Sequence, residues 1–273
     1  MKAAPFDYLR PDTVAEACAA LAQDGTTTAA IAGGQSLLPM LNLRVAVIDL
    51  LVDISRLEEL KDFTATPAGL RIGALTTHAA VEDGKIPDVS AGLMRRVAGQ
   101  IAYRAVRNHG TIGGSVALAD PAADWPACLM ALGADVRIAG RNGLRSEPVT
   151  EFVQDAYSTS LTAGEIILGF DLPRAPLRWG FAKVTRKSGA FADSIAFVVA
   201  RGEGGPLSVV LGGTSSRARL LPTVAEHLRA GKSAESLRPA IAKDLEVQVP
   251  DADAYQTRMH TATILRAVRE LRA

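Results

Sequence analysis

The sequence feature that most constrains the fold is a Gly-Gly pair at residues 33–34, placed between an apolar run and an amphipathic segment. Residues 29–32 suit a buried strand, and the segment from Leu37 onward suits a helix. Glycine can adopt positive φ and has no Cβ, so the backbone here can turn tightly and approach a bound group. Gln35 and Ser36 add polar side chains where N–H groups converge at a helix start. The pattern predicts a strand, an anion-binding turn and a helix, although turns that bind nothing share it.

A second stretch repeats this chemistry at residues 111–115, Thr-Ile-Gly-Gly-Ser. Thr111 and Ser115 flank the glycines with hydroxyls, and Asp124 follows with a carboxylate that can accept a hydrogen bond from a ribose or a backbone amide. Diphosphate and sugar together need about this set of groups, so the two stretches predict a dinucleotide site. Asp124 also stands near the start of an expected helix at 124–132, which leaves a structural role for it equally open.

These residues carry a family resemblance. Residues 32–40, with Leu43-Arg44 behind them, are similar to the first FAD-binding motif of the medium, flavin-carrying subunits of molybdenum hydroxylases. That group includes the CO dehydrogenase medium subunit and the xanthine dehydrogenase flavin domain. Residues 111–115 with 119–124 resemble the second motif of the family, and the resemblance extends over essentially the whole chain. It implies an α+β fold: a two-lobed FAD-binding domain of the vanillyl-alcohol-oxidase type, followed by a C-terminal domain with a small antiparallel sheet and helices.

The expected domain boundary lies in the segment 173–176, where two prolines and an alanine form the best linker candidate. We expect an FAD-binding domain at 1–174, with lobes at about 1–56 and 57–174. A C-terminal domain like that of CO dehydrogenase flavoproteins is expected at 175–273. The main strands expected in the first domain are 5–8, 29–32, 47–53, 61–66, 70–74, 135–139, 144–148 and the strand ending at 173, with 135–139 and 144–148 forming a hairpin across the glycine-containing turn at 140–143. Those expected in the second are 179–186, 194–202 and 207–213, with a turn at 203–206, followed by helices at 223–230, 234–245 and 254–271.

The resemblance also implies which residues contact the cofactor. Beyond the two motifs, Leu161, Lys183 and Phe191 match family positions near the isoalloxazine ring, although they also suit a core leucine, a strand lysine and a core aromatic. Leu118 and Ala190 stand where the family often has polar residues. No catalytic residue and no metal ligand is expected. The expected FAD-binding residues are Ala32, Gly33, Gly34, Gln35, Ser36, Leu37, Thr111, Gly114, Ser115, Asp124, Leu161, Lys183 and Phe191.

The cysteine count limits what the chain can hold by itself. Cys18 and Cys128 are its two cysteines, each within an expected helix, whereas an iron–sulfur cluster needs four thiolates. The four histidines show no zinc-ligand spacing with them. The resemblance implies that a small partner subunit carries two [2Fe–2S] clusters and a large one carries the molybdenum cofactor. An (αβγ)2 assembly is the expected arrangement.

Charge and hydropathy exclude other classes of partner. Lys+Arg 30 against Asp+Glu 29 gives a net charge of +1, which provides no strong field for nucleic acid. The basic clusters, such as Arg104 with Arg107, suit a solvated face or an interface rim. The longest uncharged run, 26–43, contains glycines and a proline, so no membrane span is expected. The N-terminus has no apolar region typical of a secretion signal, and we expect a cytoplasmic protein.

These observations together predict an FAD-binding, electron-transferring subunit of a molybdenum hydroxylase. Two alternatives stay open: a free-standing flavin oxidoreductase of the same fold, and a non-enzymatic scaffold in which both glycine stretches are structural. A P-loop is excluded because Glu226 occupies the position of its first glycine, and no G-x-G-x-x-G sequence is present. The sequence does not identify the substrate of the large subunit or the terminal electron acceptor.

Overall fold

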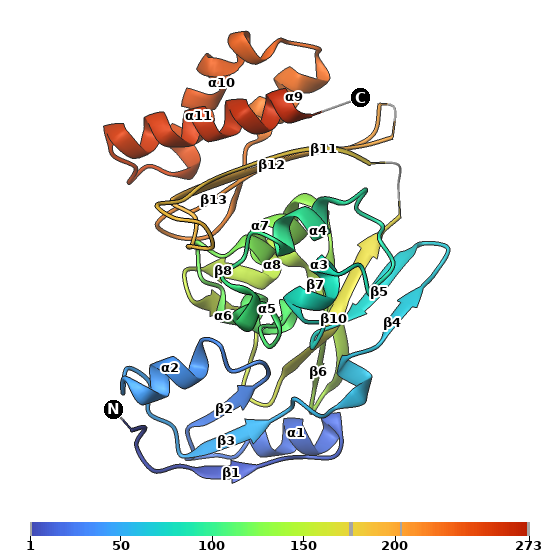
Figure 1. The fold of residues 1–273 in the computed structure, drawn as a ribbon. Coiled ribbons are helices and arrows are strands. Elements are labelled where there is room, and N and C mark those ends of the chain that lie inside the picture. Colours follow the sequence, from blue (N-terminus) through green and yellow to red (C-terminus); the bar gives the residue numbers. More distant parts are fainter. Residues whose placement is uncertain (1, 175–176, 203, 272–273) are drawn as a thin grey trace.

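A computed structural model describes residues 2–174, 177–202 and 204–271, which form an α+β fold (Figure 1). The N-terminal sheet has three parallel strands in the order β1-β3-β2: β1 (Asp7–Leu9), β2 (Thr28–Ile31) and β3 (Leu50–Asp53). Helices α1 (Val14–Leu21) and α2 (Leu37–Asn42) pack on it. Side chains alternate along β3, so Leu50 and Val52 pack in the cluster that contains α1 while Leu51 packs with Leu41 of α2. The central strand is therefore buried on both faces.

The N-terminus of α1 shows how its sequence fits this position. The Thr13 hydroxyl accepts a hydrogen bond from the Glu16 N–H at 3.2 Å, as expected for a helix cap. The Glu16 carboxylate accepts from the N–H of Asp12 at 2.9 Å rather than from the cap residue itself. Gly25 follows the helix with a φ of 71°, a conformation that glycine adopts without strain.

The second sheet is antiparallel, with five strands in the order β4-β5-β10-β6-β7. The strands are β4 (Phe63–Ala65), β5 (Gly69–Gly73), β6 (Asp135–Gly140), β7 (Gly143–Pro148) and β10 (Ile166–Pro173). The expected hairpin of β6 and β7 is confirmed. Because β10 lies between β5 and β6, two distant parts of the chain are joined at the centre of this sheet.

Most of the helices of this region lie between β5 and β6 in the sequence. They are α3 (His78–Glu82), α4 (Leu93–Ala98), α5 (Arg104–Arg107), α6 (Ile112–Leu118) and α7 (Asp124–Ala131). A 3₁₀ turn, η1 (Glu58–Leu60), precedes β4, and β7 is followed by α8 (Val149–Phe152), β8 (Val153–Asp155) and β9 (Ser158–Thr159). The sequence patterns did not predict α5, α8 or the β8–β9 pair, because elements this short have too few residues to show a period.

The third sheet is also antiparallel and has helices on both faces. Its strands, in order, are β11 (Leu177–Val184), β12 (Ser194–Arg201), β13 (Leu207–Gly212) and β14 (Arg219–Leu220). Figure 1 shows α9 to α11 over one face and α4 and α7 beneath the other. Ile195, Phe197 and Val199 of β12 pack in the core that contains α7, whereas Ala196 and Val198 pack with α11. The covering helices are α9 (Pro222–Arg229), η2 (Ala234–Leu237), α10 (Arg238–Gln248) and α11 (Ala254–Glu270).

The expected boundary between domains falls at the junction of the second and third sheets. Ala175 and Pro176 of the linker candidate, and Glu203 of an expected turn, lie outside the described residues. One hydrophobic core joins Trp125 of α7 to Phe197 of β12, so the two sides of the boundary share buried contacts. The division at 174 and 175 therefore stays a prediction.

Three properties of the described ranges bear on the possible chemistry. No helix in them is long and apolar enough to cross a lipid bilayer. No group of three or more His, Cys, Asp or Glu side chains in the same ranges could hold a metal ion. Cys18 in α1 and Cys128 in α7 are buried and form no disulfide, as small apolar core residues do.

Candidate functional site

The first glycine turn presents a run of backbone N–H groups. The N–H groups of residues 33–37 donate to no acceptor among the described residues, although Leu38 N–H already bonds the carbonyl of Gly34. Gly34 has a φ of 70°, whereas Gly33 is not left-handed. The Ser36 hydroxyl makes no capping bond to α2. Five successive free N–H groups at the end of β2 form a concentration of positive partial charge that suits an anion.

Gly33 is required by close backbone packing and not by a positive φ. A Cβ on Gly33 would lie 1.9 Å from the carbonyl oxygen of His109 and 3.0 Å from Cα of Gly110. Only a residue without a side chain allows the end of β2 to lie this close to the segment before the second glycine stretch. A Cβ on Gly114 would in turn lie 3.9 Å from Cβ of Ala32. The two motifs, about 80 residues apart in the sequence, are thus direct neighbours.

The second motif is the first turn of α6 and not a second loop with free N–H groups. Thr111 is its cap residue, and its hydroxyl accepts from the Gly114 N–H at 3.0 Å. The N–H groups of Ile112 and Gly113 donate to carbonyls of the loop after β5, at 3.0 and 2.9 Å. Neither glycine of this motif has positive φ. The second stretch repeats the Gly-Gly pattern of the first but not its free N–H groups or positive φ, because tertiary contacts already satisfy this helix start.

What α6 offers to a ligand is its exposed side. Gly114 is exposed and Ser115 is half-buried, so a bare stretch of backbone and one hydroxyl lie beside the first turn. Thr111 is buried, and its hydroxyl can still donate one hydrogen bond while it accepts the capping bond.

Asp124 and Lys183 are brought together by the fold. Lys183 Nζ lies 2.8 Å from Oδ1 and donates to Oδ2 of Asp124 at 2.9 Å, and the side chains are 3% and 5% exposed. Burial raises the pKa of Asp124, and the lysine charge opposes that shift. Asp124 is the first residue of α7, whose N-cap is Ala123, so it does not cap the helix. This buried ion pair connects α7 to β11 across the expected domain boundary.

Leu161 and Phe191 lie on separate loops. Leu161 is partly buried against the large core, and its loop is fastened by Arg145, which donates to Glu165 at 2.7 and 2.8 Å and to the Ser160 carbonyl at 3.0 Å. Phe191 is 61% exposed in the connection from β11 to β12. The next residue donates its N–H to the Ala122 carbonyl at 3.3 Å, which places Phe191 close to the segment that follows α6.

Two residues near the motifs were not recognised from the sequence. His78 Nδ1 accepts a hydrogen bond from the indole N–H of Trp125 at 2.9 Å, and a Cβ on Gly110 would lie 2.7 Å from its Nε2. Burial, with the charge of Arg107, lowers the pKa of His78 to about 4, so the ring is neutral at pH 7. Arg107 is only 13% exposed and pairs with Glu82, so of the two expectations, a solvated face or an interface rim, the solvated face does not apply to it. Glu82 lies 25 residues before Arg107 in the sequence, so no local pattern indicated that the two would pair.

Comparison with known proteins gives one family. Residues 4–175 match the family model described as FAD binding domain in molybdopterin dehydrogenase. The chain is 32% identical to the carbon monoxide dehydrogenase medium chain of Afipia carboxidovorans, over 98% of this chain and 97% of that one. It is 38% identical to the 6-hydroxypseudooxynicotine dehydrogenase complex subunit alpha of Paenarthrobacter nicotinovorans, over 80% and 76%.

Solved structures agree over nearly the full length. Quinoline 2-oxidoreductase from Pseudomonas putida 86 superposes with a TM-score of 0.90 at 30% identity, covering 99% of this chain and 98% of that chain. Carbon monoxide dehydrogenase from Hydrogenophaga pseudoflava gives a TM-score of 0.91 at 31% identity, with the same coverage. The similarity therefore includes the C-terminal sheet and helices as well as the region that the family model matches.

Proposed function

The chain belongs to the family of FAD-binding domains in molybdopterin dehydrogenases, and we propose that it is the medium subunit of a molybdenum-containing hydroxylase or dehydrogenase. In this role it passes electrons from [2Fe–2S] clusters of a partner subunit, by way of FAD, to a terminal acceptor. The observation that carries the proposal is the contact between the two glycine motifs, which places the free N–H groups of residues 33–37 beside the exposed side of α6.

The residues of this region fit FAD. The diphosphate of a dinucleotide is an anion, and five N–H groups with no acceptor in the described chain can bind it without displacing a protein contact. We assign this role to the N–H groups of Gly33, Gly34, Gln35, Ser36 and Leu37, with Ala32 at the base of the same turn. Thr111, Gly114 and Ser115 then face the adjoining part of the cofactor. When bound, FAD supplies one- and two-electron transfer, and the protein supplies binding and electrostatics.

We assign the ring end of the cofactor to Leu161, Lys183, Phe191 and Asp124. Exposure supports this for Phe191, since an aromatic ring that is mostly free of protein contacts is available to pack on another ring. Lys183 and Asp124 form a buried ion pair in which Asp124 Oδ1 makes no hydrogen bond, so we assign them a fixed charge pair between α7 and β11 at the ring end.

We also propose the finer architecture. The parallel sheet with α1 and α2 forms the first lobe of a vanillyl-alcohol-oxidase-type FAD-binding domain, and the five-stranded sheet with α3 to α8 forms the second. The C-terminal domain begins at 175. The end of the family match at residue 175 and the separate third sheet support this division.

Partner subunits complete the proposal. Cys18 and Cys128 are both buried, and two thiols cannot ligate a [2Fe–2S] cluster, which needs four. The relatives named as a medium chain and as a subunit of a dehydrogenase complex support a multi-subunit assembly. We propose a small iron–sulfur subunit and a large molybdenum subunit, in an (αβγ)2 complex of the cytoplasm.

Titration of the apoprotein with FAD tests the first step, and two glycines provide a matched pair of variants. Gly34 and Gly25 have nearly the same left-handed φ, 70° and 71°, so replacement by alanine introduces the same backbone strain at both, with further side-chain contacts at Gly34, the closest 3.0 Å from the flexible end of Leu38. Only Gly34 belongs to the N–H run. Gly34→Ala should weaken FAD binding about tenfold while Gly25→Ala leaves it unchanged, measured by flavin fluorescence. Equal effects of both variants would contradict the assignment of the turn.

Isolation of the native complex separates the alternatives. Recovery with a molybdenum subunit and an iron–sulfur subunit supports the proposal. A lone, flavin-loaded chain that turns over a substrate without either metal would make it a free-standing oxidoreductase. A chain that binds no FAD, in any assembly, would be a scaffold.

A further inference from the structure

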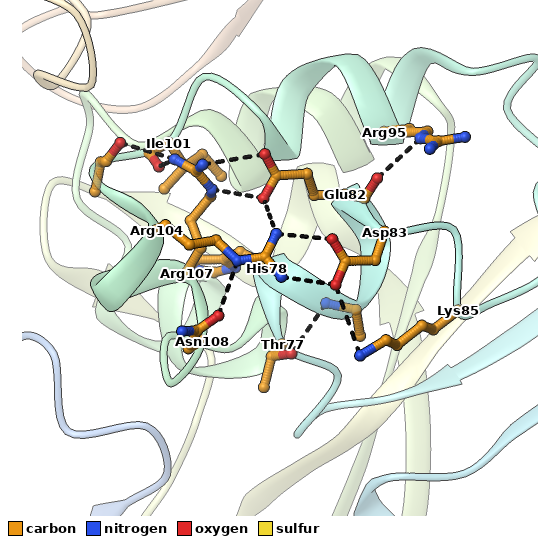
Figure 2. A network of polar contacts seen from close by, with 12 residues as sticks. Thr77, His78, Glu82, Asp83, Lys85, Arg95, Ile101, Arg104, Arg107 and Asn108 are labelled. Carbon is orange, nitrogen blue, oxygen red and sulfur yellow. Dashed lines mark hydrogen bonds and ion pairs between the residues drawn. The ribbon is translucent and has the colours of Figure 1, made fainter.

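A polar network lies beside the second motif, between α3 and α5 (Figure 2). Glu82, the last residue of α3, accepts from Arg107 Nε at 2.8 Å and Nη2 at 3.0 Å. It also accepts from Arg104 at 2.8 Å, and Arg104 makes two further bonds of 2.7 Å to Asp83. The hydrogen bonds from Arg107 contribute most to lowering the pKa of Glu82, so its carboxylate is charged at neutral pH.

Arg107 differs from the rest of this network in its burial and its second set of bonds. Its side chain is 13% exposed, against 49% for Arg104. Its Nη1 donates to the carbonyls of Ile101 and Ala102, both at 2.9 Å. Ala102 has a φ of 44°, a left-handed conformation that is strained for an alanine. The guanidinium therefore fixes a strained turn of backbone to α3.

This turn contacts the loop that carries Phe191. Gly189 has a φ of 77°, and a Cβ on it would lie 2.6 Å from the carbonyl oxygen of Ala102. The Ala102 carbonyl, which accepts from Arg107, is thus in direct backbone contact with the connection from β11 to β12. Phe191 lies two residues beyond this contact, so a shift of Ala102 moves the base of its loop.

Arg107 is also close in the sequence to the contact between the two glycine motifs. It is the last residue of α5, and two residues later the His109 carbonyl lies where Gly33 can have no Cβ. Gly110 N–H closes this turn with a 2.7 Å bond to the Val106 carbonyl. One guanidinium is therefore connected, through a few backbone atoms each way, to the loop of Phe191 and to the first glycine turn.

We propose that Arg107 and Glu82 form a positioning pair that sets the separation between the first glycine turn and the loop of Phe191. The inference rests on the proposed function, in which these are the diphosphate end and the ring end of the FAD site. Neither side chain contacts the cofactor in this proposal. Their effect is transmitted by the backbone at residues 101–102 and 109–110.

The test compares two ion pairs of similar geometry. Glu82→Gln removes the charge that holds Arg107. Asp171→Asn is the control, because Asp171 accepts two bonds from Arg71 at 2.9 and 3.3 Å but lies, half-exposed, in the second sheet. For both variants we would measure the FAD dissociation constant, the visible circular dichroism of bound flavin, the flavin midpoint potential and the melting temperature of the apoprotein.

Glu82→Gln should weaken FAD binding about tenfold and change the visible circular dichroism, while Asp171→Asn leaves both as in wild type. Arg107→Lys keeps the charge but loses the donors to the two carbonyls, so it should reproduce the spectral change even if Glu82→Gln does not fold. Variants with lower melting temperatures but wild-type affinity, dichroism and potential would show a merely structural pair and overturn the inference. A wild-type chain that binds no FAD would overturn the proposed function itself, and this inference with it.

Discussion

Replacing Gly33 by alanine should force the two glycine motifs apart. The added Cβ would lie 1.9 Å from the His109 carbonyl oxygen, about 1.5 Å inside ordinary van der Waals contact. The crowding atoms are backbone, so no side-chain rotation can relieve it. Because Gly33 is not left-handed, backbone strain adds little, and the effect of the variant is almost purely a displacement.

The size of this displacement sets the expected magnitude. Overpacking of this kind costs about 1–3 kcal/mol of stability. A displacement of about 1 Å in a binding site typically reduces function on the order of 10²-fold. We therefore expect the FAD dissociation constant to rise roughly 100-fold, which corresponds to a loss of about 2.8 kcal/mol of binding free energy. The assay is flavin fluorescence titration of the apoprotein, with chemical unfolding of the same sample.

Gly69→Ala is the matched control for crowding. Its Cβ would also lie 1.9 Å from a backbone carbonyl, that of Leu172, but at the opposite end of β5 from the loop that contacts α6. It should lose comparable stability and keep its FAD affinity. Wild-type FAD affinity in Gly33→Ala would refute the inference that the contact between the two glycine motifs forms the FAD site. An equal loss of affinity in Gly33→Ala and Gly69→Ala would refute it as well.

Three further outcomes are expected. Gly114→Ala would bring its Cβ to 2.9 Å from the Thr111 hydroxyl that caps α6, so it should lower apoprotein stability by about 1–2 kcal/mol and raise the FAD dissociation constant about tenfold in the same titration. Lys183→Met leaves Asp124 buried and unpaired, so urea unfolding at pH 8 should show a loss of about 3–5 kcal/mol. That deficit should shrink at pH 5, because loss of the lysine raises the pKa of Asp124 further and the folded variant then takes up a proton. The pKa of His78 is lowered from 6.5 to about 4, so the free energy of unfolding of the wild-type protein should fall by roughly 3 kcal/mol as the pH is lowered from 6.5 to 4. A His78→Gln variant should lose less stability over the same range.

Patterns within a few residues predicted much of the fold. The apolar run and the Gly-Gly pair predicted β2, the turn and α2, and Gly34 has the positive φ that such a turn uses. Alternating strands predicted the antiparallel third sheet, and the glycine-containing turn after β6 predicted its hairpin. The motif resemblance led to the family that the comparisons show. Each of these depends on local periodicity or on the conformational freedom of one residue type, which a sequence displays directly.

The tertiary structure decided which groups remain free for a ligand and which do not. In the sequence the two glycine motifs look alike, but the carbonyls of the loop after β5 satisfy the N–H groups of α6, while those of residues 33–37 have no such neighbour. In the same way Asp124 and Lys183, 59 residues apart, become partners only when β11 packs against α7. Arg107 looks like a surface residue until Glu82 and two carbonyls surround it. A hydrogen bond or an ion pair depends on distances of a few tenths of an ångström between distant segments, and those distances are set by the packing of the whole chain.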